Sequence, residues 1–556
     1  MTNKKFLESK REHICLITNH GYAGVNFPTG GAPDSGGQII YVNELAKAMD
    51  KLGYKVSIFT RGNFPFFQSE KIRKGVEFLS EYSRYVYIEA GNTEFVPKED
   101  ISNILDEEVE WLYEFINKEA ALKKVKPYNY FKFISTHYWD AAVIGMKLIE
   151  RWQNDLVFEI LKKEKCIKTA VLNKYFQDRH KLYISKNVEY YIGEMFLSQI
   201  KNVPSSPAVL KMEDEIVKFY KYNDVSKLKN ILKSTKRVKP HLIFSALALK
   251  IGKLIISNFK TDLHKELEKL NKHEWTPHSL GAIKERNFWD KDVEIKRKLK
   301  FLERKSYEDE ICRKVPYLAA TSEEVVETFV NYYKVDLKKI IYFPPCIDDG
   351  FKYREKASCS KALNFLEEKT GYSKDELLNL KVVFETSRMD KTKRKDILIK
   401  AFNTVVKQND NSILVIGGGP DNEVFKSLIK LKQEYPALKR KVFIVGYIPG
   451  EVIPELFSFA YLYVSPSEME GFGMSVQQAI ASRVPVVCSD LIPVAIQYLA
   501  ESSLIVPHGK VDKFSTAILK MLNNEQLREK FAEKSYEISK QFNWQVQTEK
   551  FINTIK

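Results

Sequence analysis

The pattern that most constrains the fold is a short apolar run, a glycine-rich loop, an amphipathic helix and a second apolar run, in that order. His13–Thr18 is the first apolar run and Lys55–Thr60 is the second. Runs this short and this apolar are typical of parallel strands buried on both faces. The residues between them that recur at helical spacing are Val42, Leu45, Ala46, Met49 and Leu52. The pattern predicts a β-α-β unit that opens a doubly wound sheet.

A second unit of the same kind starts with the apolar run Lys381–Thr386. A helix with an apolar face follows it, and further strands are expected at Ser412–Ile416, Lys441–Val445 and Val484–Cys488. A chain of 556 residues is also longer than one core usually supports. We therefore predict an α/β protein with two Rossmann-like domains, 1–345 and 346–540, that meet near the diproline Pro344-Pro345.

The alternation of expected strands and helices stops between about residues 151 and 270. We interpret this segment as a mainly helical insertion in the first domain. This segment holds 24 Lys and Arg residues against 13 Asp and Glu, which accounts for most of the chain's net charge of +16. Such charge suits an anionic membrane, a phosphorylated substrate, a nucleic acid or simply a solvated surface. The apolar stretch Leu242–Ile256 would either dock on a membrane or pack on the domain or on a second subunit.

Several protein classes are excluded by what the sequence lacks. It has no run of about 18 apolar residues and no apolar signal core near its start, so we expect a cytoplasmic protein, at most peripheral to a membrane. The six cysteines show no CxxC spacing, so neither a zinc site nor a disulfide framework is expected. The dinucleotide fingerprint GxGxxG is absent, which argues against a nicotinamide or flavin enzyme. The sequence lacks a motif of interleaved aromatic and basic residues, so a nucleic-acid partner is not expected.

Three clusters carry residue types that could bind a charged ligand. The loop at Gly36, Gly37 and Gln38 lies between a strand and a helix, where bare N–H groups attract anions. Arg388 and Lys393 follow a strand, at the sheet edge where α/β proteins bind ligands, and could neutralise a diphosphate. The third cluster is an acid before a glycine turn and a helix, Glu470-Gly471-Phe472-Gly473. Each could also be an ordinary basic loop or helix N-terminus.

Five motifs in order make the chain recognisable: PDSGGQIIYVNELAKAMDKLGYKVSIFTR, THYWDAAVIG, TPHSLGAIKERN, TSRMDKTKRKDILIKAF and PSEMEGFGMSVQQAIASRVPVVCSD. Together they resemble the GT-B retaining glycosyltransferases of family 4, most closely the branch of sucrose-phosphate synthase and sucrose synthase. The resemblance covers roughly residues 10–150 and 271–545. It implies two Rossmann-like domains facing a cleft, with a C-terminal helix, 541–556, that crosses back to the first domain.

The resemblance also implies roles for individual residues. The glycine loop would face the acceptor and the donor phosphates. His137 matches the histidine of the family's GHY motif and would help to bind donor or acceptor, and His278 would lie beside the transferred sugar. Arg388 and Lys393 would hold the nucleotide diphosphate. On the donor sugar and ribose side, the matching positions are Glu470, Gly471, Phe472, Gly473 and Gln478.

Three positions depart from the family pattern. Gln478 stands where the family has the second acid of an E-x7-E motif, which holds the ribose. Arg394 stands where Asn is usual, and Arg483 where a small residue or glycine is common. The departure at Gln478 concerns ribose affinity more than chemistry, because an amide accepts hydrogen bonds less strongly than a carboxylate.

The function implied is transfer of a sugar, with retention, from a nucleotide diphosphate sugar to a sugar or sugar-phosphate acceptor. UDP-glucose is the expected donor and co-substrate, and neither a cofactor nor a metal is expected, because cations and helix N–H groups can carry the leaving charge. Two alternatives stay open: transfer to a lipid or glycan at a membrane surface through the basic insertion, and a catalytically weak GT-B binding protein. Self-association through the insertion is also open.

Overall fold

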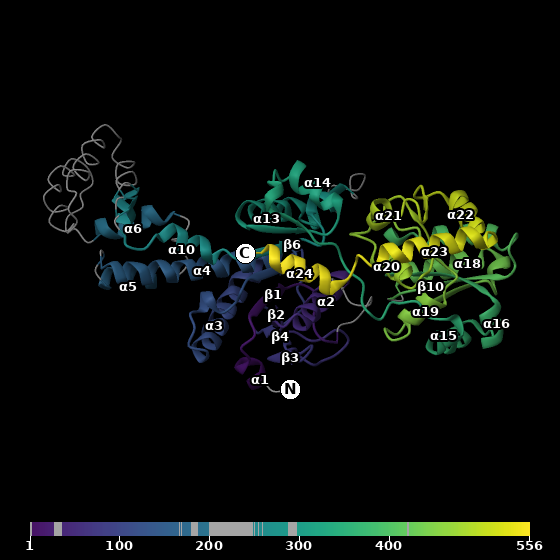
Figure 1. Ribbon diagram of the computed structural model, residues 1–556, viewed down its shortest axis with the longest axis horizontal. Helices are drawn as coiled ribbons and strands as arrows, with labels where there is room; N and C mark the ends of the chain where they lie inside the picture. Colours follow the sequence, from purple (N-terminus) through teal and green to yellow (C-terminus); the bar gives the residue numbers. More distant parts are fainter. Residues whose placement is uncertain are drawn as a thin grey trace. The chain divides into compact units, whose positions relative to one another are not determined.

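The computed structural model describes residues 3–26, 36–165, 167, 169–178, 187–198, 248–249, 251–253, 255–257, 259–286, 297–419 and 422–555. They belong to two compact units. One unit contains Met1–Trp111, Phe131–Gly145 and His273–Lys556, and the other contains Leu112–Tyr130 and Met146–Lys272. The first unit holds two separate sheets with helices on both, which confirms the predicted α/β class with two Rossmann-like halves (Figure 1).

The first sheet has eight strands in the order β3-β4-β2-β1-β5-β6-β7-β8. All neighbours are parallel except the antiparallel pair β3 and β4. The strands are β1 (His13–Thr18), β2 (Lys55–Arg61), β3 (Val76–Phe78), β4 (Ser83–Ile88), β5 (Ile134–His137), β6 (His273–Thr276), β7 (Tyr317–Ala320) and β8 (Ile340–Tyr342). The helices connecting them are α1 (Asn3–Glu8), α2 (Gly37–Lys51), α3 (Leu105–Leu122), α4 (Trp139–Glu164), α11 (Gly281–Arg286), α13 (Phe301–Lys314) and α14 (Glu323–Asn331).

The second sheet has six parallel strands in the order β11-β10-β9-β12-β13-β14. They are β9 (Lys381–Thr386), β10 (Ser412–Gly417), β11 (Val442–Gly446), β12 (Leu462–Ser465), β13 (Val486–Ser489) and β14 (Leu504–Val506). The helices are α15 (Ser360–Thr370), α16 (Lys374–Asn379), α17 (Lys395–Val405), α18 (Glu423–Gln433), α19 (Ile453–Phe459), α20 (Met474–Ala481), α21 (Pro493–Tyr498), α22 (Val511–Asn523) and α23 (Glu525–Ser539). The chain then continues to α24 (Trp544–Thr554).

Helix α2 begins and ends at glycines, as its sequence predicts. Gly36 precedes the helix in extended backbone, and the amide of Ile39 donates to its carbonyl at 3.0 Å. Gly53 follows the helix with a φ of +90°, a conformation that a side chain would strain. The inner face of α2 is buried at Val42, Leu45 and Met49. The helix therefore places its free N-terminus at the carboxyl edge of the first sheet.

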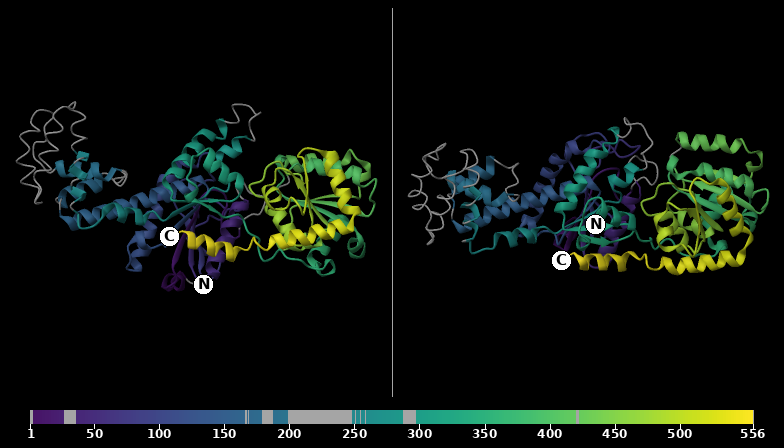
Figure 2. Two further views of the ribbon diagram at one scale, coloured as in Figure 1. Left: turned by 45° about the horizontal axis from the view of Figure 1, so that its top comes forward. Right: turned by 90° about the horizontal axis from the view of Figure 1, so that it is seen from above.

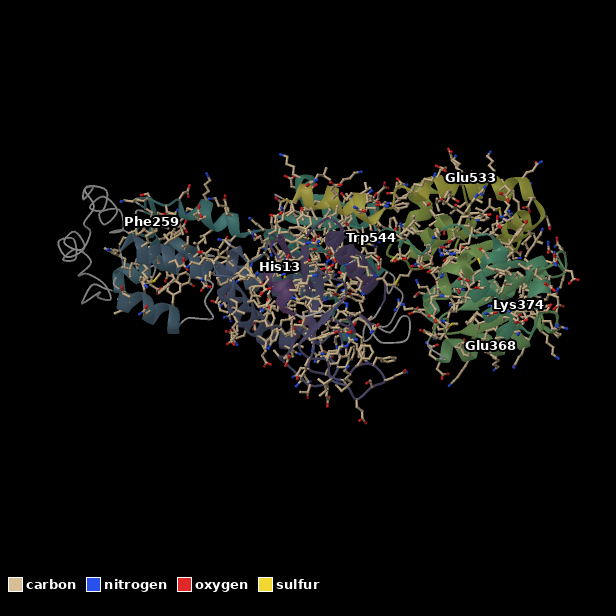
Figure 3. The ribbon with its side chains drawn as sticks, turned by 60° about the horizontal axis from the view of Figure 1, so that its bottom comes forward. His13, Phe259, Glu368, Lys374, Glu533 and Trp544 are labelled. Carbon is tan, nitrogen blue, oxygen red and sulfur yellow. The ribbon has the colours of Figure 1, made fainter. Side chains whose placement is uncertain are left out.

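Helix α24, at the end of the chain, packs on helix α2 of the first sheet (Figures 1 and 2). Asn543 caps it by accepting a hydrogen bond from the amide of Val546 at 3.0 Å. Trp544, labelled in Figure 3, packs against Tyr41 in a T-shaped arrangement with ring centroids 4.9 Å apart. Phe551 stacks on Phe343 at 4.6 Å. Helix α24 is thus part of the core of the first sheet. The predicted domain boundaries at residues 345 and 540 stay predictions.

The second compact unit is helical in its described residues and has a core of its own. That core joins α4 to α5 (Thr169–Asp178), α6 (Val188–Ser198) and α10 (Leu263–Leu270). Ile251 and Ile255, from the apolar stretch predicted at 242–256, are buried in this core. A Cβ at Gly252 would overlap the carbonyl of Glu189 on α6, so the two backbones touch there. The described part of the stretch therefore packs inside its own unit.

Residues 242–247, 250 and 254 of that stretch lie outside the described residues. So does the segment 233–239, in which four of seven residues are Lys or Arg. Among the helices that the structure describes, none is long and apolar enough to cross a membrane.

Truncating Phe551 tests the role of α24 in the core. Phe551→Ala should lower the free energy of unfolding by about 3–5 kcal/mol, because it leaves a cavity between Phe343 and Phe133. Chemical denaturation followed by fluorescence measures the change. The exposed neighbour Lys550→Ala is the control and should change stability by no more than about 0.5 kcal/mol. Equal stability of the two variants would show that α24 is not part of the core.

Candidate active site

Three neighbouring strands of the first sheet end at the same level. Their final residues, Thr18, His137 and Thr276, are register partners across β1, β5 and β6. Gln38, in the first turn of α2, donates from its amide to the Thr18 hydroxyl at 2.9 Å and to the His137 carbonyl at 3.3 Å. The predicted residues Gln38 and His137 are therefore brought together at this edge, and the side chain of Gln38 fixes the start of α2 on it.

The two histidines that the sequence predicted as site residues are in direct contact. His137 Nδ1 lies 3.0 Å from His278 Nε2. Burial lowers the pKa of His137 to about 3, and burial together with the nearby His137 and His20 holds the pKa of His278 well below its usual range. Both rings are therefore neutral at physiological pH. His278 has a φ of +54°, and Tyr41 packs against its ring at 4.9 Å, so the surroundings hold a strained backbone in place.

At the second sheet, the site residues follow β9. Lys393, buried in a short 3₁₀ turn (Lys391–Lys393), donates to Glu470 Oε1 at 2.6 Å and to the carbonyl of Met469 at 3.0 Å. Arg388 is exposed, and its side chain makes no hydrogen bond or ion pair with any residue that the structure describes. The structure therefore pairs Lys393 with Glu470 and leaves the guanidinium of Arg388 free to meet a ligand.

A buried ion pair that the sequence did not reveal supports the loop that carries Arg388. Lys395 Nζ is 3.0 Å from Glu385 Oε2 and donates to the carbonyls of Ser387 and Gly417. Burial is the main cause that lowers the pKa of Lys395, against the attraction of Glu385. Gly418 has a φ of +112°, and a Cβ there would overlap the Ser387 carbonyl. The loop that carries Arg388 is thus held from beneath by β9 and β10.

The glycine turn after Glu470 allows close backbone packing. Gly473 has a φ of +107° at the start of α20, and a Cβ there would lie 2.6 Å from Ile492. A Cβ at Gly471 would lie 3.3 Å from the carbonyl oxygen of His278. Phe472 is buried in the core of the unit, which makes it a packing residue. Gln478 is half-buried on α20.

Residues of the two sheets approach each other at two points. Gly471 lies beside His278, and a Cβ at Gly37 would be 3.3 Å from the sulfur of Met474. The helix N-termini of α2 and α20 are therefore both at this meeting edge, as are the histidine pair and the Lys393–Glu470 pair. Residues 27–35, which precede Gly36 in the sequence, lie outside the described residues.

Two departures from the family pattern share one physical feature. Arg394 has a φ of +49° and Arg483 a φ of +58°. Both values lie in the left-handed region, which Gly and Asn adopt with less strain than other residues. Each arginine is held by an acid instead: Arg394 pairs with Glu468 and with Asp396 at 3.1 Å. Arg483 pairs with Glu533 of α23, labelled in Figure 3, at 2.6 Å. The substitutions change side-chain partners while the backbone keeps the conformation that the usual residues favour.

A cationic cluster around Tyr138 was missed by sequence reasoning. Arg304 of α13 donates to the Tyr138 hydroxyl and, through Nε, to Glu308 at 2.7 Å, and Lys284 lies 3.4 Å from the same hydroxyl. Burial by itself would raise the pKa of Tyr138, but the charges of Arg304, Lys284 and Lys98 outweigh it, so this pKa is lowered. Lys284 stands within the recognised TPHSLGAIKERN motif, but Arg304 lies outside every motif, so only the fold could join them.

The described residues contain no group of three or more His, Cys, Asp or Glu side chains placed to hold a metal ion.

Known proteins are similar to this chain both in sequence and in fold. Residues 372–538 match the family model of glycosyl transferases group 1. Mannosylfructose-phosphate synthase of Agrobacterium fabrum is 24% identical over 485 residues, 85% of this chain and 75% of that protein. A probable sucrose-phosphate synthase of Thermosipho melanesiensis is 36% identical over 121 residues, 20% of this chain and 25% of that protein.

Two solved structures are similar over nearly the whole chain. Sucrose-phosphate synthase from Thermosynechococcus elongatus has a TM-score of 0.60 at 18% identity and covers 97% of both chains. The Anabaena protein HepE, solved with UDP-glucose, has a TM-score of 0.53 at 11% identity and covers 98% of this chain and 99% of its own. At these identities the structures establish the fold. The chain carries a glycosyltransferase group 1 domain and is a glycosyltransferase with the GT-B fold.

Proposed function

We propose that the protein transfers glucose, with retention of configuration, from UDP-glucose to a sugar phosphate. The names of two relatives, mannosylfructose-phosphate synthase and probable sucrose-phosphate synthase, support a phosphorylated product. The structure of HepE with UDP-glucose supports the donor. The observation that carries the proposal is the arrangement of Lys393, Glu470 and the free Arg388 at the start of α20, where positive charge and bare N–H groups face one point.

This arrangement suits departure of a nucleoside diphosphate. In the proposed reaction the bond between the anomeric carbon and the diphosphate oxygen breaks, and negative charge grows on that oxygen. Arg388 and Lys393 would stabilise this charge: Lys393 is desolvated and held in place by Glu470, and Arg388 has a guanidinium that is free to meet the diphosphate. Glu470, which orients Lys393, has a second oxygen available for a hydroxyl of the donor sugar.

The other half of the reaction forms the new glycosidic bond. The acceptor oxygen would attack the anomeric carbon on the face that the diphosphate leaves, and its proton would pass to the departing phosphate oxygen. That step needs no carboxylate base, which agrees with the role of Glu470 as the partner of Lys393. Retention follows because the bond that breaks and the bond that forms share one face of the sugar.

The cationic cluster at Tyr138 supports a phosphorylated acceptor. Arg304, Lys284 and Lys98 place three positive charges near one hydroxyl, close enough to lower its pKa. Glu308 balances Arg304 with an ion pair at 2.7 Å, and Glu99 balances Lys98 at 3.5 Å, so the surplus charge is that of Lys284. The phosphate of an acceptor is the kind of group that such a surplus of positive charge recognises. We therefore propose that this cluster binds the acceptor's phosphate.

Charge removal at the diphosphate residues tests the donor side. Arg388→Ala and Lys393→Ala should each lower kcat by about 10²- to 10³-fold, because each removes one positive charge that stabilises the leaving group. Lys391→Ala, in the same turn but exposed, is the control and should keep normal turnover. Release of the nucleotide measures the rate. A soluble Arg388 or Lys393 variant as active as the Lys391 variant would remove that residue from the site.

Gln478→Glu tests the contact with the ribose. If this half-buried side chain accepts a hydrogen bond from a ribose hydroxyl, a carboxylate at the same position should accept it more strongly by roughly 1 kcal/mol. The Kd of UDP should then fall about fivefold. Isothermal titration calorimetry of UDP with both proteins measures the difference. An unchanged Kd would mean that position 478 does not contact the nucleotide.

The acceptor site is tested by comparing phosphorylated and unphosphorylated acceptors. Lys284→Gln should raise the KM for the sugar phosphate about tenfold or more, because a hydrogen bond to a charged group contributes about 1.5–3 kcal/mol. The KM for the same sugar without phosphate should stay as it is. Arg286→Gln, two residues away and paired with Glu324, is the matched control. If Lys284→Gln raises the KM equally for both acceptors, the cluster does not recognise phosphate.

A further inference from the structure

A chain of hydrogen bonds runs from His278 into the core of the first sheet. His278 Nε2 lies 3.0 Å from His137 Nδ1, and His137 Nε2 lies 3.3 Å from the Ser135 hydroxyl. The Ser135 hydroxyl donates to Glu274 Oε2 at 2.5 Å. Ser135 and His137 share one face of β5, and Glu274 is the register partner of Ser135 on β6. Hydrogen-bond contacts thus connect His278 of the candidate site continuously to the buried carboxyl group of Glu274.

Hydrogen-bond donors surround the carboxyl group of Glu274 at the end of this chain. Its other oxygen accepts from the Thr276 hydroxyl at 2.8 Å, and the main chain of Ala319 adds a further hydrogen bond. Glu274 is fully buried, so its proton can be exchanged only rarely with water. Burial raises the pKa of this carboxyl to about 8, against the three hydrogen bonds that lower it.

The direction of every bond in the chain depends on whether Glu274 carries a proton. When it is ionised, Ser135 donates to it, His137 Nε2–H donates to Ser135, and His278 Nε2–H donates to His137. His278 Nδ1 is then bare and can only accept. When Glu274 is protonated and donates to Ser135, each link reverses, and His278 becomes an Nδ1–H donor. The two states differ by one proton, which enters at His278 Nδ1 and ends on Glu274.

We infer that Glu274 is a positioning residue that sets the tautomer of His278 through Ser135 and His137. The consequence for turnover rests on the proposed function and on the position beside the transferred sugar that the family resemblance implies for His278. A bare Nδ1 can accept a hydrogen bond from a sugar hydroxyl, whereas an Nδ1–H directs a partial positive charge at a carbon that becomes positive in the transition state. The ionised state of Glu274 is therefore the active one, and activity rises with pH as Glu274 loses its proton.

Other titratable groups face this chain and must be separated from it. His20, held by Asp140 at 3.1 Å, faces His278, and Tyr41 of α2 packs on His278. Tyr41 has its pKa raised well above the usual value by burial, so it stays neutral in the relevant range. His273 hydrogen-bonds to Thr136 at 2.8 Å, on the opposite face of the same two strands.

That opposite face provides a matched control. Thr136→Val removes a buried hydroxyl from β5 next to Ser135, together with its bonds to His273 and to the main-chain carbonyl of Glu274. The side-chain contacts from Glu274 through Ser135 and His137 to His278 stay intact. Ser135→Ala removes the hydroxyl that joins His137 to Glu274. Glu274→Gln keeps the shape of the side chain and removes its titration.

The test reads the tautomer of His278 directly. Protein labelled with ¹⁵N at its nine histidines is followed by long-range ¹H–¹⁵N correlation from pH 6 to 9.5, with His278 assigned from the spectrum of a His278→Gln variant. In the wild type, the hydrogen should move from Nδ1 to Nε2 of His278 with a midpoint near pH 8. Glu274→Gln and Ser135→Ala should abolish this change, whereas Thr136→Val and His20→Gln should keep it.

The pH profile of kcat/KM gives a second readout. Its rise near pH 8 should be present in the wild type and in Thr136→Val and absent in Glu274→Gln. A His278 tautomer that stays the same across the pH range, or that changes equally in Ser135→Ala, would overturn the inference. Because the spectra need no substrate, they decide it even if the protein releases no nucleotide from UDP-glucose, an outcome that would contradict only the proposed function.

Discussion

The candidate site depends on the shared register of three parallel strands. Because β1, β5 and β6 are paired at Thr18, His137 and Thr276, the loops that follow them start at one level. Residues far apart in the chain, such as Gln38 and His278, are then within a few ångströms of one strand end. In a parallel sheet all strands run the same way, so this edge is also where the helix N-termini gather. The geometry follows from the fold class itself.

Buried charge determines how the site is held together. Lys393, Lys395 and Arg304 are all largely removed from water, and each has a carboxylate within 3.0 Å. A buried cation without such a partner would be costly, so these pairs restrict where the loops can lie. Arg388 is the contrasting case, since it is exposed and unpaired among the described residues. The site therefore combines cations that are fixed by acids with one that is free for a ligand.

The strands with the plainest patterns could be predicted from the sequence to the residue, as β1 and β9 show. Strand β13 begins two residues after the expected Val484, because the amide of that residue still closes the end of α20 by donating to Ala479. Strand β12 was missed because Leu462–Ser465 is too short for a clear alternation. Local patterns thus identify elements, while exact ends depend on which hydrogen bonds the neighbouring element requires.

The site residues could be predicted only where a motif carried them. Contacts such as His137 with His278 or Lys393 with Glu470 join segments that are 141 and 77 residues apart, a proximity that no local pattern contains. Arg304 and Glu274 could not be predicted at all, because each lies within an ordinary helix or strand, and its role comes from what packs beside it. The departures at Arg394 and Arg483 could be noticed in the sequence, but their shared left-handed backbone could not.

The central claim is retaining transfer of glucose from UDP-glucose to a phosphorylated sugar. It is tested most directly by incubating the pure protein with UDP-glucose and a panel of hexose phosphates and determining the anomeric configuration of any disaccharide phosphate by NMR. Because the donor is an α-glucoside, the account predicts UDP release that depends on the acceptor and a product with an α linkage. A β-linked product, or no UDP release with any member of the panel, would contradict it.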